Sequence, residues 1–541
     1  MLTGHAARLF AAALLAGSGH ALAQTTGSEE PYVETIEVSV VNLEVLVTDR
    51  KGDPIARLSR EDFTVFEDGR EVEITNFYAE GADAAGSPAA AGAAARPPEQ
   101  RLRLVVFVDD VNTEPRNRTP ILDRLTGFLR RELRPGDEVM VVRYARSLEI
   151  RQPFTGDPAT TEATVAEIKR LAADLDAREF SRDELWGRIG DMLEVGWSEA
   201  IEGQLRIYAE HEERQVVGAL NALDAVVGWL GGVAGRKAIL YVSDGIPLAP
   251  GDDAFQWASF RSPYRAGQRM SALSGHQYDA TDRFRKVTAR ASRNRVAIYP
   301  IEAAGVRTVR GTMLQEIVVT NRQNGLRFLA DDTGGRAMLN AADPGAALEL
   351  MAEDLGSYYS LGYRPTRSGD EIEHKVEVKV GVKGAQVRHR RWYRDKPLAE
   401  AVAERTAAVM RFGPEDNPLD ATLEVREQSP GAGGVLVPLR VRVPLAKLYL
   451  EPTATGKAAR LRLFVVASGG GKTTPVKETR TLTVEIPAAG AEPGAGQEYV
   501  HEVGLTLQPG DWAVGVGIRD EAGGVVAYLR KELTVNLPAG R

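Results

Sequence analysis

The residues best suited to chemistry follow two apolar segments of the chain. Asp109 and Asp110 come directly after an apolar run at 104–108, and Asp244 follows a second run at 238–242. Runs of four to six apolar residues without polar alternation are typical of strands that are covered on both faces, as in a parallel sheet flanked by helices. Because ligands bind at the carboxyl ends of such strands, the sequence predicts one acidic, oxygen-lined site at that edge.

At these positions the chain resembles the von Willebrand factor type A (VWA) family. The resemblance covers roughly residues 101–340 and rests on the order and spacing of the segments and on Ser243-Asp244-Gly245 at a strand end. The family's metal-ion-dependent adhesion site holds Mg²⁺ or Mn²⁺ with an Asp-x-Ser-x-Ser loop plus a Thr and an Asp from neighbouring strand ends. The β unit before this segment and residues 358–365 after it resemble an exported bacterial subgroup typified by acidobacterial sequences.

The resemblance implies a metal site in one of two registers. With Asp109 as the first ligand, the two serine positions fall on Val111, which has no side-chain oxygen, and on Thr113. One residue later, the series begins at Asp110 and offers amide and carboxylate oxygens in place of the hydroxyls. The candidate metal ligands are therefore Asp109, Asp110, Asn112, Thr113 and Asp244.

This site departs from the family pattern, so two interpretations stay open. Asp244 is the one family ligand placed without ambiguity, whereas no threonine stands between Thr164 and Thr281 to serve as the family's Thr ligand. One interpretation is a degenerate adhesion site that binds Mg²⁺ or Mn²⁺ as cofactor. The alternative is a metal-free fold in which the Asp residues cap helices or hydrogen-bond loops.

Changes of pattern along the chain predict its organisation. Residues 32–78 predict a small β unit, and residues 79–100 are an Ala/Gly/Pro-rich linker. Repeated strand–helix units over residues 101–396 predict an α/β domain with a doubly wound, mainly parallel sheet, with insertions and with strands at its end. Evenly spaced short strands over residues 415–541 predict an all-β, sandwich-like domain.

The amino terminus predicts export. Arg8 precedes an apolar run at 9–16, and Ala21-Leu22-Ala23 provides an A-x-A site, so residues 1–23 have the form of a signal peptide. The mature protein is then periplasmic or secreted. The chain has no cysteine, which excludes disulfides and thiol chemistry. No later run reaches the roughly 18 apolar residues of a transmembrane segment, and the net charge of −8 argues against nucleic acid as a partner.

These features predict a non-enzymatic module that binds a protein partner, which the sequence does not identify. The resemblance implies that the loops after the parallel strands form the binding face, and insertions at 176–213 and 249–275 flank the strand that ends near Asp244. One alternative is a metal-independent structural protein of the cell envelope. Another is a metal-dependent hydrolase that uses Asp109, Asp110 and Asp244, although no histidine follows these strands closely.

A basic stretch lies on or beside a helix predicted at 280–293. It consists of Arg283, Arg285, Lys286, Arg290, Arg293 and Arg295. The stretch is interpreted as a solvated helix face, and the alternative is a surface that docks an acidic protein or a cell-surface polymer.

Overall fold

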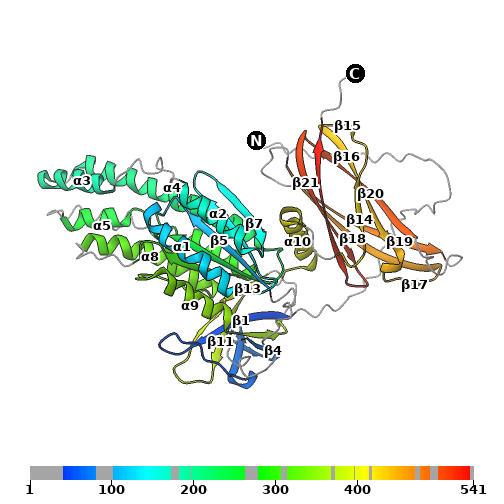
Figure 1. The fold of residues 1–541 in the computed structure, drawn as a ribbon, viewed down its shortest axis with the longest axis horizontal. Helices are drawn as coiled ribbons and strands as arrows, with labels where there is room; N and C mark the ends of the chain where they lie inside the picture. Colours follow the sequence, from blue (N-terminus) through cyan, green and yellow to red (C-terminus); the bar gives the residue numbers. More distant parts are fainter. Residues whose placement is uncertain are drawn as a thin grey trace.

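The computed structural model describes residues 40–80, 101–171, 182–196, 198–261, 278–305, 313–366, 372–394, 396–413, 417–469, 476–487 and 497–536. The predicted signal peptide and nearly all of the predicted linker lie outside these residues. The described parts form an α/β unit, a small β unit beside it and a carboxyl-terminal β domain (Figure 1). In these ranges no helix has both the length and the apolar character needed to cross a membrane.

A five-stranded sheet forms the centre of the α/β unit, in the order β7-β6-β5-β8-β9. Its strands are β5 (Leu102–Asp109), β6 (Glu138–Tyr144), β7 (Leu148–Thr155), β8 (Arg236–Ser243) and β9 (Val296–Glu302). The four strands from β6 to β9 in this order are parallel, and β7 is an antiparallel edge strand. The mainly parallel sheet predicted from the sequence is therefore confirmed, whereas β7 was not predicted.

Helices cover both faces of this sheet, which explains why its strands are apolar throughout. Along β5, the side chains of Leu104 and Val106 face one core and those of Val105 and Phe107 face the other, because successive strand residues point to opposite faces. The first core is closed by α1 (Pro115–Glu132), α2 (Pro158–Arg170) and α9 (Pro344–Gly356). The second is closed by α4 (Glu199–Leu230), α7 (Thr281–Arg293) and α8 (Met313–Thr333).

The insertion predicted at 176–213 contributes to a helical extension beyond the carboxyl edge of the sheet. The extension consists of α3 (Arg182–Val195), residues 199–213 of α4 and α5 (Asp252–Arg261), and these share a core of their own. At 32 residues, α4 is about 48 Å long, whereas an eight-residue strand such as β8 spans about 26 Å. Because α4 ends directly before β8 begins, its first half extends past the sheet (Figure 1).

The small β unit is built from two parts of the chain that lie far apart in sequence. One sheet joins β1 (Val41–Thr48) and β4 (Ile74–Glu80) to β10 (Tyr358–Tyr363) and β12 (Gln386–Arg388). The other joins β2 (Phe63–Glu67) and β3 (Arg70–Val72) to β11 (Glu373–Val380) and β13 (Trp392–Arg394).

This pairing differs from the sequence-based division, in which residues 358–394 end the α/β segment 101–396. In the structure, β10 lies between β1 and β4, and its Tyr359, Leu361 and Tyr363 belong to the core of the small β unit. The alternation of apolar residues shows that a strand has a buried face. It does not show which distant strand is its partner, because antiparallel pairing is not a local property.

The carboxyl-terminal domain consists of α10 (Leu398–Phe412) and two antiparallel sheets that enclose one core. The first sheet contains β14 (Thr422–Val425), β15 (Ser429–Gly431), β16 (Gly434–Pro444) and β20 (Glu498–Leu507). The second contains β17 (Glu451–Thr453), β18 (Gly456–Gly469), β19 (Val476–Pro487), β21 (Gly510–Asp520) and β22 (Val526–Val535). Helix α10 packs closely on β21, where a Cβ at Gly517 would lie 2.3 Å from the hydroxyl oxygen of Thr406.

Candidate functional site

The structure brings all five candidate residues to the carboxyl edge of the parallel sheet. Strands β5 and β8 are neighbours, so the residues that follow them lie side by side. The backbone N–H of Asp244 donates to the carbonyl oxygen of Asn112 over 2.9 Å, which joins the two loops directly. The side chains are all buried, so a charge on any of them is costly unless the protein compensates it. The five are Asp109, Asp110, Asn112, Thr113 and Asp244.

Both carboxylate oxygens of Asp109 accept hydrogen bonds, from its own loop and from β8. Its Oδ1 accepts from the backbone N–H of Val111 at 3.2 Å and of Asn112 at 3.1 Å. Its Oδ2 accepts from the side-chain amide of Asn112 at 2.8 Å and from the Tyr241 hydroxyl. Burial raises the pKa of Asp109 to about 6, although the hydrogen bonds from Tyr241 and Asn112 act in the opposite direction.

Asp110 points away from Asp109 and forms a buried charge cluster. Its two oxygens pair with Arg118 of α1 and with the Nε of Arg143 on β6, the latter at 2.5 Å. The Arg118 side chain is fully buried, and it also donates to the carbonyl oxygens of Ile168, at 3.0 Å, and Leu171 at the end of α2. The two guanidinium groups therefore compensate the carboxylate and tie the loop to both α1 and α2.

Asp244, which follows β8, caps the amino terminus of α1, the helix that follows the neighbouring strand β5. Its Oδ2 accepts from the backbone N–H of Glu114 at 2.8 Å and from the side-chain amide of Asn117 at 2.9 Å. Glu114 is the N-cap residue of α1, and its own side chain makes no capping hydrogen bond. A carboxylate at this position accepts from unpaired N–H groups and interacts favourably with the helix dipole. Nearby, the Thr113 hydroxyl donates to the carbonyl oxygen of Val242 at 3.4 Å.

The carboxylate oxygens of Asp109 and Asp110 do not offer the open ligand positions that a hard divalent cation needs. Mg²⁺ requires near-octahedral oxygen ligands, whereas both oxygens of Asp110 have guanidinium partners and both oxygens of Asp109 accept hydrogen bonds. Within the described ranges, no group of three or more His, Cys, Asp or Glu residues is placed to hold a metal. In this arrangement Asp244 caps a helix and Asp109 accepts hydrogen bonds from its own loop.

The residues that sequence reasoning missed here are the partners of the acids. Arg143 interrupts the apolar strand β6, and Arg118 lies eight residues after Asp110 on α1. A charged residue at the end of an apolar strand is an available signal, because burial of an unpaired guanidinium is costly. Tyr241 carries a similar signal, since a hydroxyl in the middle of a buried strand needs a partner.

The loop after Asp244 leads directly into the helical extension. Gly245 has a φ of +117°, and a Cβ there would lie 2.7 Å from the Cβ of Arg322 on α8. Arg322 in turn forms a buried ion pair of 3.0 Å with Glu212 of α4. These contacts place the extension beside the acidic edge. Two large apolar side chains of the extension are exposed, namely Ile207 at 46% and Phe260 at 62%.

Comparisons with known proteins find a weak likeness to several solved structures. No family model and no curated protein matches the chain. Similar solved structures include an aerotolerance-related membrane protein from Bacteroides fragilis, with 11% identity over 47% of this chain and 98% of that chain and a TM-score of 0.22. BatB from Bacteroides thetaiotaomicron shares 11% identity over 47% and 97% of the chains, with a TM-score of 0.23. Manganese-loaded TRAP from Plasmodium vivax shares 12% identity over 56% and 97%, also with a TM-score of 0.23.

Proposed function

We propose that the chain is an exported, non-enzymatic protein-binding module of the VWA type whose binding edge works without a metal ion. The observation that carries the proposal is the pairing of Asp110 with Arg118 and Arg143. Fixed guanidinium groups compensate the carboxylate, so the loops at this edge keep their arrangement without a divalent cation. The site is then a degenerate adhesion site that holds the loops in place for a partner.

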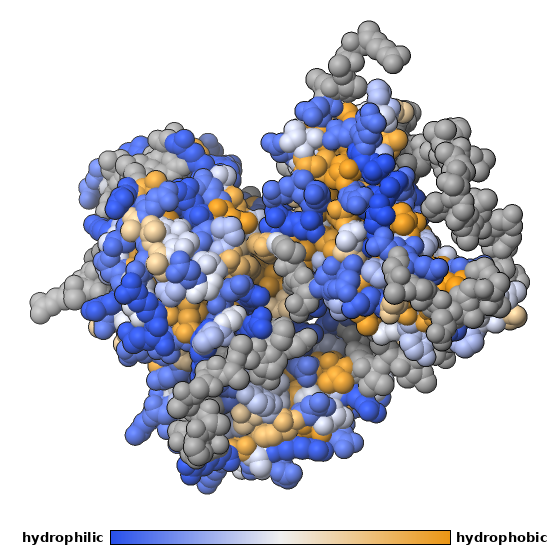
Figure 2. Space-filling model, turned by 45° about the vertical axis from the view of Figure 1, so that its right-hand side comes forward, coloured by the Kyte–Doolittle hydropathy of each residue, from blue (hydrophilic) through white to orange (hydrophobic). Residues whose placement is uncertain are grey.

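The helical extension supports a protein partner at this edge. It adds surface next to the loops that follow β5 and β8, and it exposes Ile207 and Phe260. Large apolar side chains that stand in a polar surrounding are common anchors of protein interfaces. On the face drawn in Figure 2, apolar residues are scattered among hydrophilic ones, and single exposed apolar residues of that kind are ordinary. Ile207 and Phe260 are distinguished by their place on the extension, next to the loops that follow β5 and β8, and that place makes this surface the one to test.

Two measurements test this function. Thermal unfolding of the mature chain with EDTA, Mg²⁺ or Mn²⁺ should give the same midpoint, because no ion stabilises the folded state. Affinity capture from an envelope extract should recover the same partner with and without EDTA. The double variant Ile207→Ser with Phe260→Ser should lose that partner, while Tyr449→Ser, at a residue of the β domain that is 59% exposed, should keep it.

Opposite results would redirect the proposal. A metal-specific rise in midpoint that disappears in Asp244→Ala would restore the metal-binding interpretation. Capture that is unchanged by the double variant would remove the helical extension from the binding surface. Export is tested separately by amino-terminal sequencing of the secreted or periplasmic protein, which should begin near Gln24.

A metal-independent structural protein of the envelope is the second candidate, because the same compensated edge would serve a scaffold equally well. It predicts that no specific partner is captured in either condition. A metal-dependent hydrolase has less support, since the oxygens of Asp109 and Asp110 are occupied by partners. Generic ester and phosphate substrates should therefore stay intact, and turnover that Asp244→Ala abolishes would contradict this.

A further inference from the structure

A basic cavity lies at the opposite end of the parallel sheet from Asp109. It has a volume of about 360 Å³ and lies between the loop before β8, the start of β9, the small β unit and α10. Seven of its described lining residues are Arg or Lys, and Glu404 is the one acidic residue among them. This volume lies within the usual range for small-molecule sites, and the lining is strongly unbalanced in charge.

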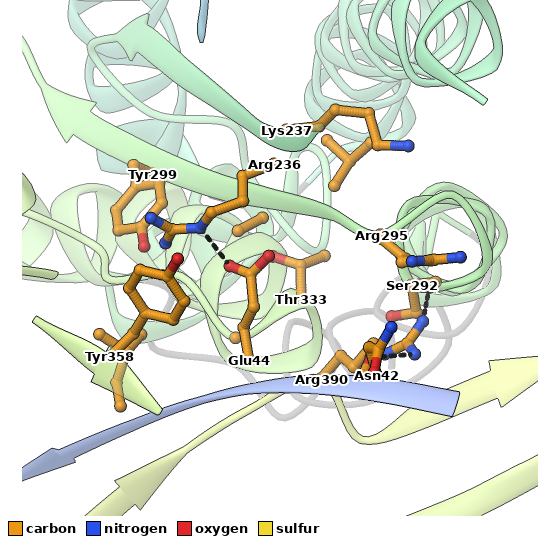
Figure 3. A pocket seen from close by; sticks show the side chains of 14 residues that line it. Asn42, Glu44, Arg236, Lys237, Ser292, Arg295, Tyr299, Thr333, Tyr358 and Arg390 are labelled. Atoms are coloured by element: carbon orange, nitrogen blue, oxygen red, sulfur yellow. Dashed lines mark hydrogen bonds and ion pairs between the residues drawn. The ribbon is translucent and has the colours of Figure 1, made fainter. Parts of the chain in front are cut away.

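A neighbouring cavity is also lined by Lys237, Arg295 and Arg390, and Glu44 is the one acidic residue among its described lining residues (Figure 3). There the guanidinium of Arg236 pairs with Glu44 at 3.0 Å and lies over the ring of Tyr358, 3.6 Å from its centroid. The figure shows the Lys237 side chain turned away from this pair, on the other side of β8. Glu44 is thus paired with Arg236, and it forms no ion pair with Lys237, Arg295 or Arg390, which line both cavities.

Three cations of the basic cavity have no carboxylate partner among the described residues. Lys237 donates only to the carbonyl oxygen of Val233, at 3.0 Å. Arg390 donates to backbone carbonyl oxygens of Ser292 at 3.0 Å and Asn42 at 2.9 Å. The Arg295 side chain forms no hydrogen bond or ion pair with a described residue, and its backbone N–H donates to the carbonyl oxygen of Ser292 at 3.2 Å. The acid of the cavity, Glu404, is already paired with Lys396 at 2.6 Å.

The proximity of these cations makes their charged forms costly. Burial, and after it the neighbouring charges of Arg295 and Lys396, lower the pKa of Lys237 to about 7. Burial and then Arg295 lower the pKa of Arg390 to about 10. An anion placed between these groups would stabilise all of them, and guanidinium forks match phosphate and carboxylate oxygens in geometry.

We propose that this cavity binds a small polyanion that carries phosphate or carboxylate groups, held by Lys237, Arg295 and Arg390. The ligand would lie where three segments meet, because Arg390 already joins β1 through Asn42 to the end of α7 through Ser292. Binding would therefore also stabilise the contact between the small β unit and the α/β unit. The cavity is far larger than the roughly 30 Å³ that one water occupies, so it has room for more than one oxyanion group.

The basic stretch on and beside α7 falls into two parts, one with ion pairs on the helix surface and one that lines the basic cavity. Arg285 pairs with Asp282 at 3.1 Å and Arg290 with Asp224 at 2.6 Å, which are ordinary surface ion pairs. Only the end of the stretch, with Arg293 and Arg295, lines the basic cavity. Arg285 and Arg290 are thus paired on the helix face, and the end of the stretch belongs to the proposed anion site.

The test is isothermal titration of the mature chain with inorganic pyrophosphate at constant ionic strength. We expect one site per chain with a Kd below about 1 mM. Arg295→Ala and Lys237→Met should each weaken binding at least about tenfold, since each removes a charged donor. Arg295 is exposed, so its variant keeps the folded protein available if Lys237→Met does not fold. The matched control is Arg283→Ala, an exposed arginine of α7 outside this cavity.

Each outcome decides the proposal. Citrate, titrated in parallel, separates carboxylate from phosphate ligands, and binding of either probe that is lost in the two cavity variants supports the site. Absence of binding for both probes overturns it. Equal binding by wild type, Arg295→Ala and Lys237→Met overturns it as well. An equal loss in Arg283→Ala does the same, because it would show only a general response to surface charge.

Discussion

The two ends of the parallel sheet treat buried charge in opposite ways. At the carboxyl edge, Asp110 is paired with two arginines and Asp244 caps α1, so the acids are satisfied within the fold. At the amino edge, Lys237 and Arg390 are bonded only to backbone carbonyl oxygens. The comparison teaches that a cluster of like charges indicates a ligand only where the protein has not supplied the counter-charge itself.

The largest expected effect comes from breaking the compensated edge at Arg118. Arg118→Ala leaves the buried carboxylate of Asp110 with one partner, and loss of a partner from a buried ion pair costs about 3–5 kcal/mol of unfolding free energy. Urea unfolding followed by circular dichroism measures this change. Arg116→Ala is the control, because the Arg116 side chain is 80% exposed and its loss should be nearly neutral. Equal effects of both variants would show that the cluster around Asp110 contributes nothing special.

The next effect concerns the pH dependence that Asp109 introduces at the same edge. The pKa of Asp109 is raised to about 6 in the folded protein. Its contribution to the free energy of unfolding is therefore fully present below about pH 4 and is lost as the pH rises through 6. Asp109→Asn keeps the shape and removes this titration. Relative to wild type, the variant should gain up to about 3 kcal/mol between pH 4 and pH 7.5. Unfolding measured across that range checks it, and a constant difference would contradict the prediction.

At the amino edge, Lys237→Met should stabilise the protein in the absence of ligand. The pKa of Lys237 is lowered to about 7, so its contribution is present above about pH 10 and is lost as the pH falls through 7. At pH 7 the free energy of unfolding of the variant should be about 1–3 kcal/mol higher, a net figure that includes the loss of the hydrogen bond to Val233. At pH 9.5 the gain should be smaller. A variant that is less stable at pH 7 would place Lys237 with the satisfied groups and would end the contrast between the two edges.

The smallest effect is expected from the helix cap at Asp244. Asp244→Ala removes the acceptor for the backbone N–H of Glu114 and should cost about 1 kcal/mol, as loss of an N-cap does. Asp244→Asn keeps an oxygen acceptor and should recover part of that loss. Both differences should be the same in EDTA and in Mg²⁺, and thermal unfolding in the two solutions checks it. A cost that appears only with Mg²⁺ would mean that Asp244 holds a metal.

Part of this structure was predictable because its causes are local. The sequence predicts a strand at Glu138–Tyr144, and β6 has these bounds. It also predicts a helix over 344–355, and α9 begins at Pro344, where Asp343 caps it. The sequence predicts a helix near 120–132, whereas α1 begins five residues earlier at Pro115, because Pro at N1 is a better start signal than the later Pro120. Helix α8 was not predicted at all, since its apolar residues are too widely mixed with polar ones to give a clear period.

The sequence by itself determined that the chain contains a mainly parallel sheet, because uninterrupted apolar strands must be covered on both faces. It also determined that Asp109, Asp110 and Asp244 share one edge, since parallel strands end on the same side. Only the tertiary structure decided which charges are compensated. The partners of Asp110 come from α1 and β6, and the cations of the basic cavity come from β8, the start of β9 and the small β unit. Ion pairing depends on distances of a few ångströms between such distant segments, and no local pattern encodes them.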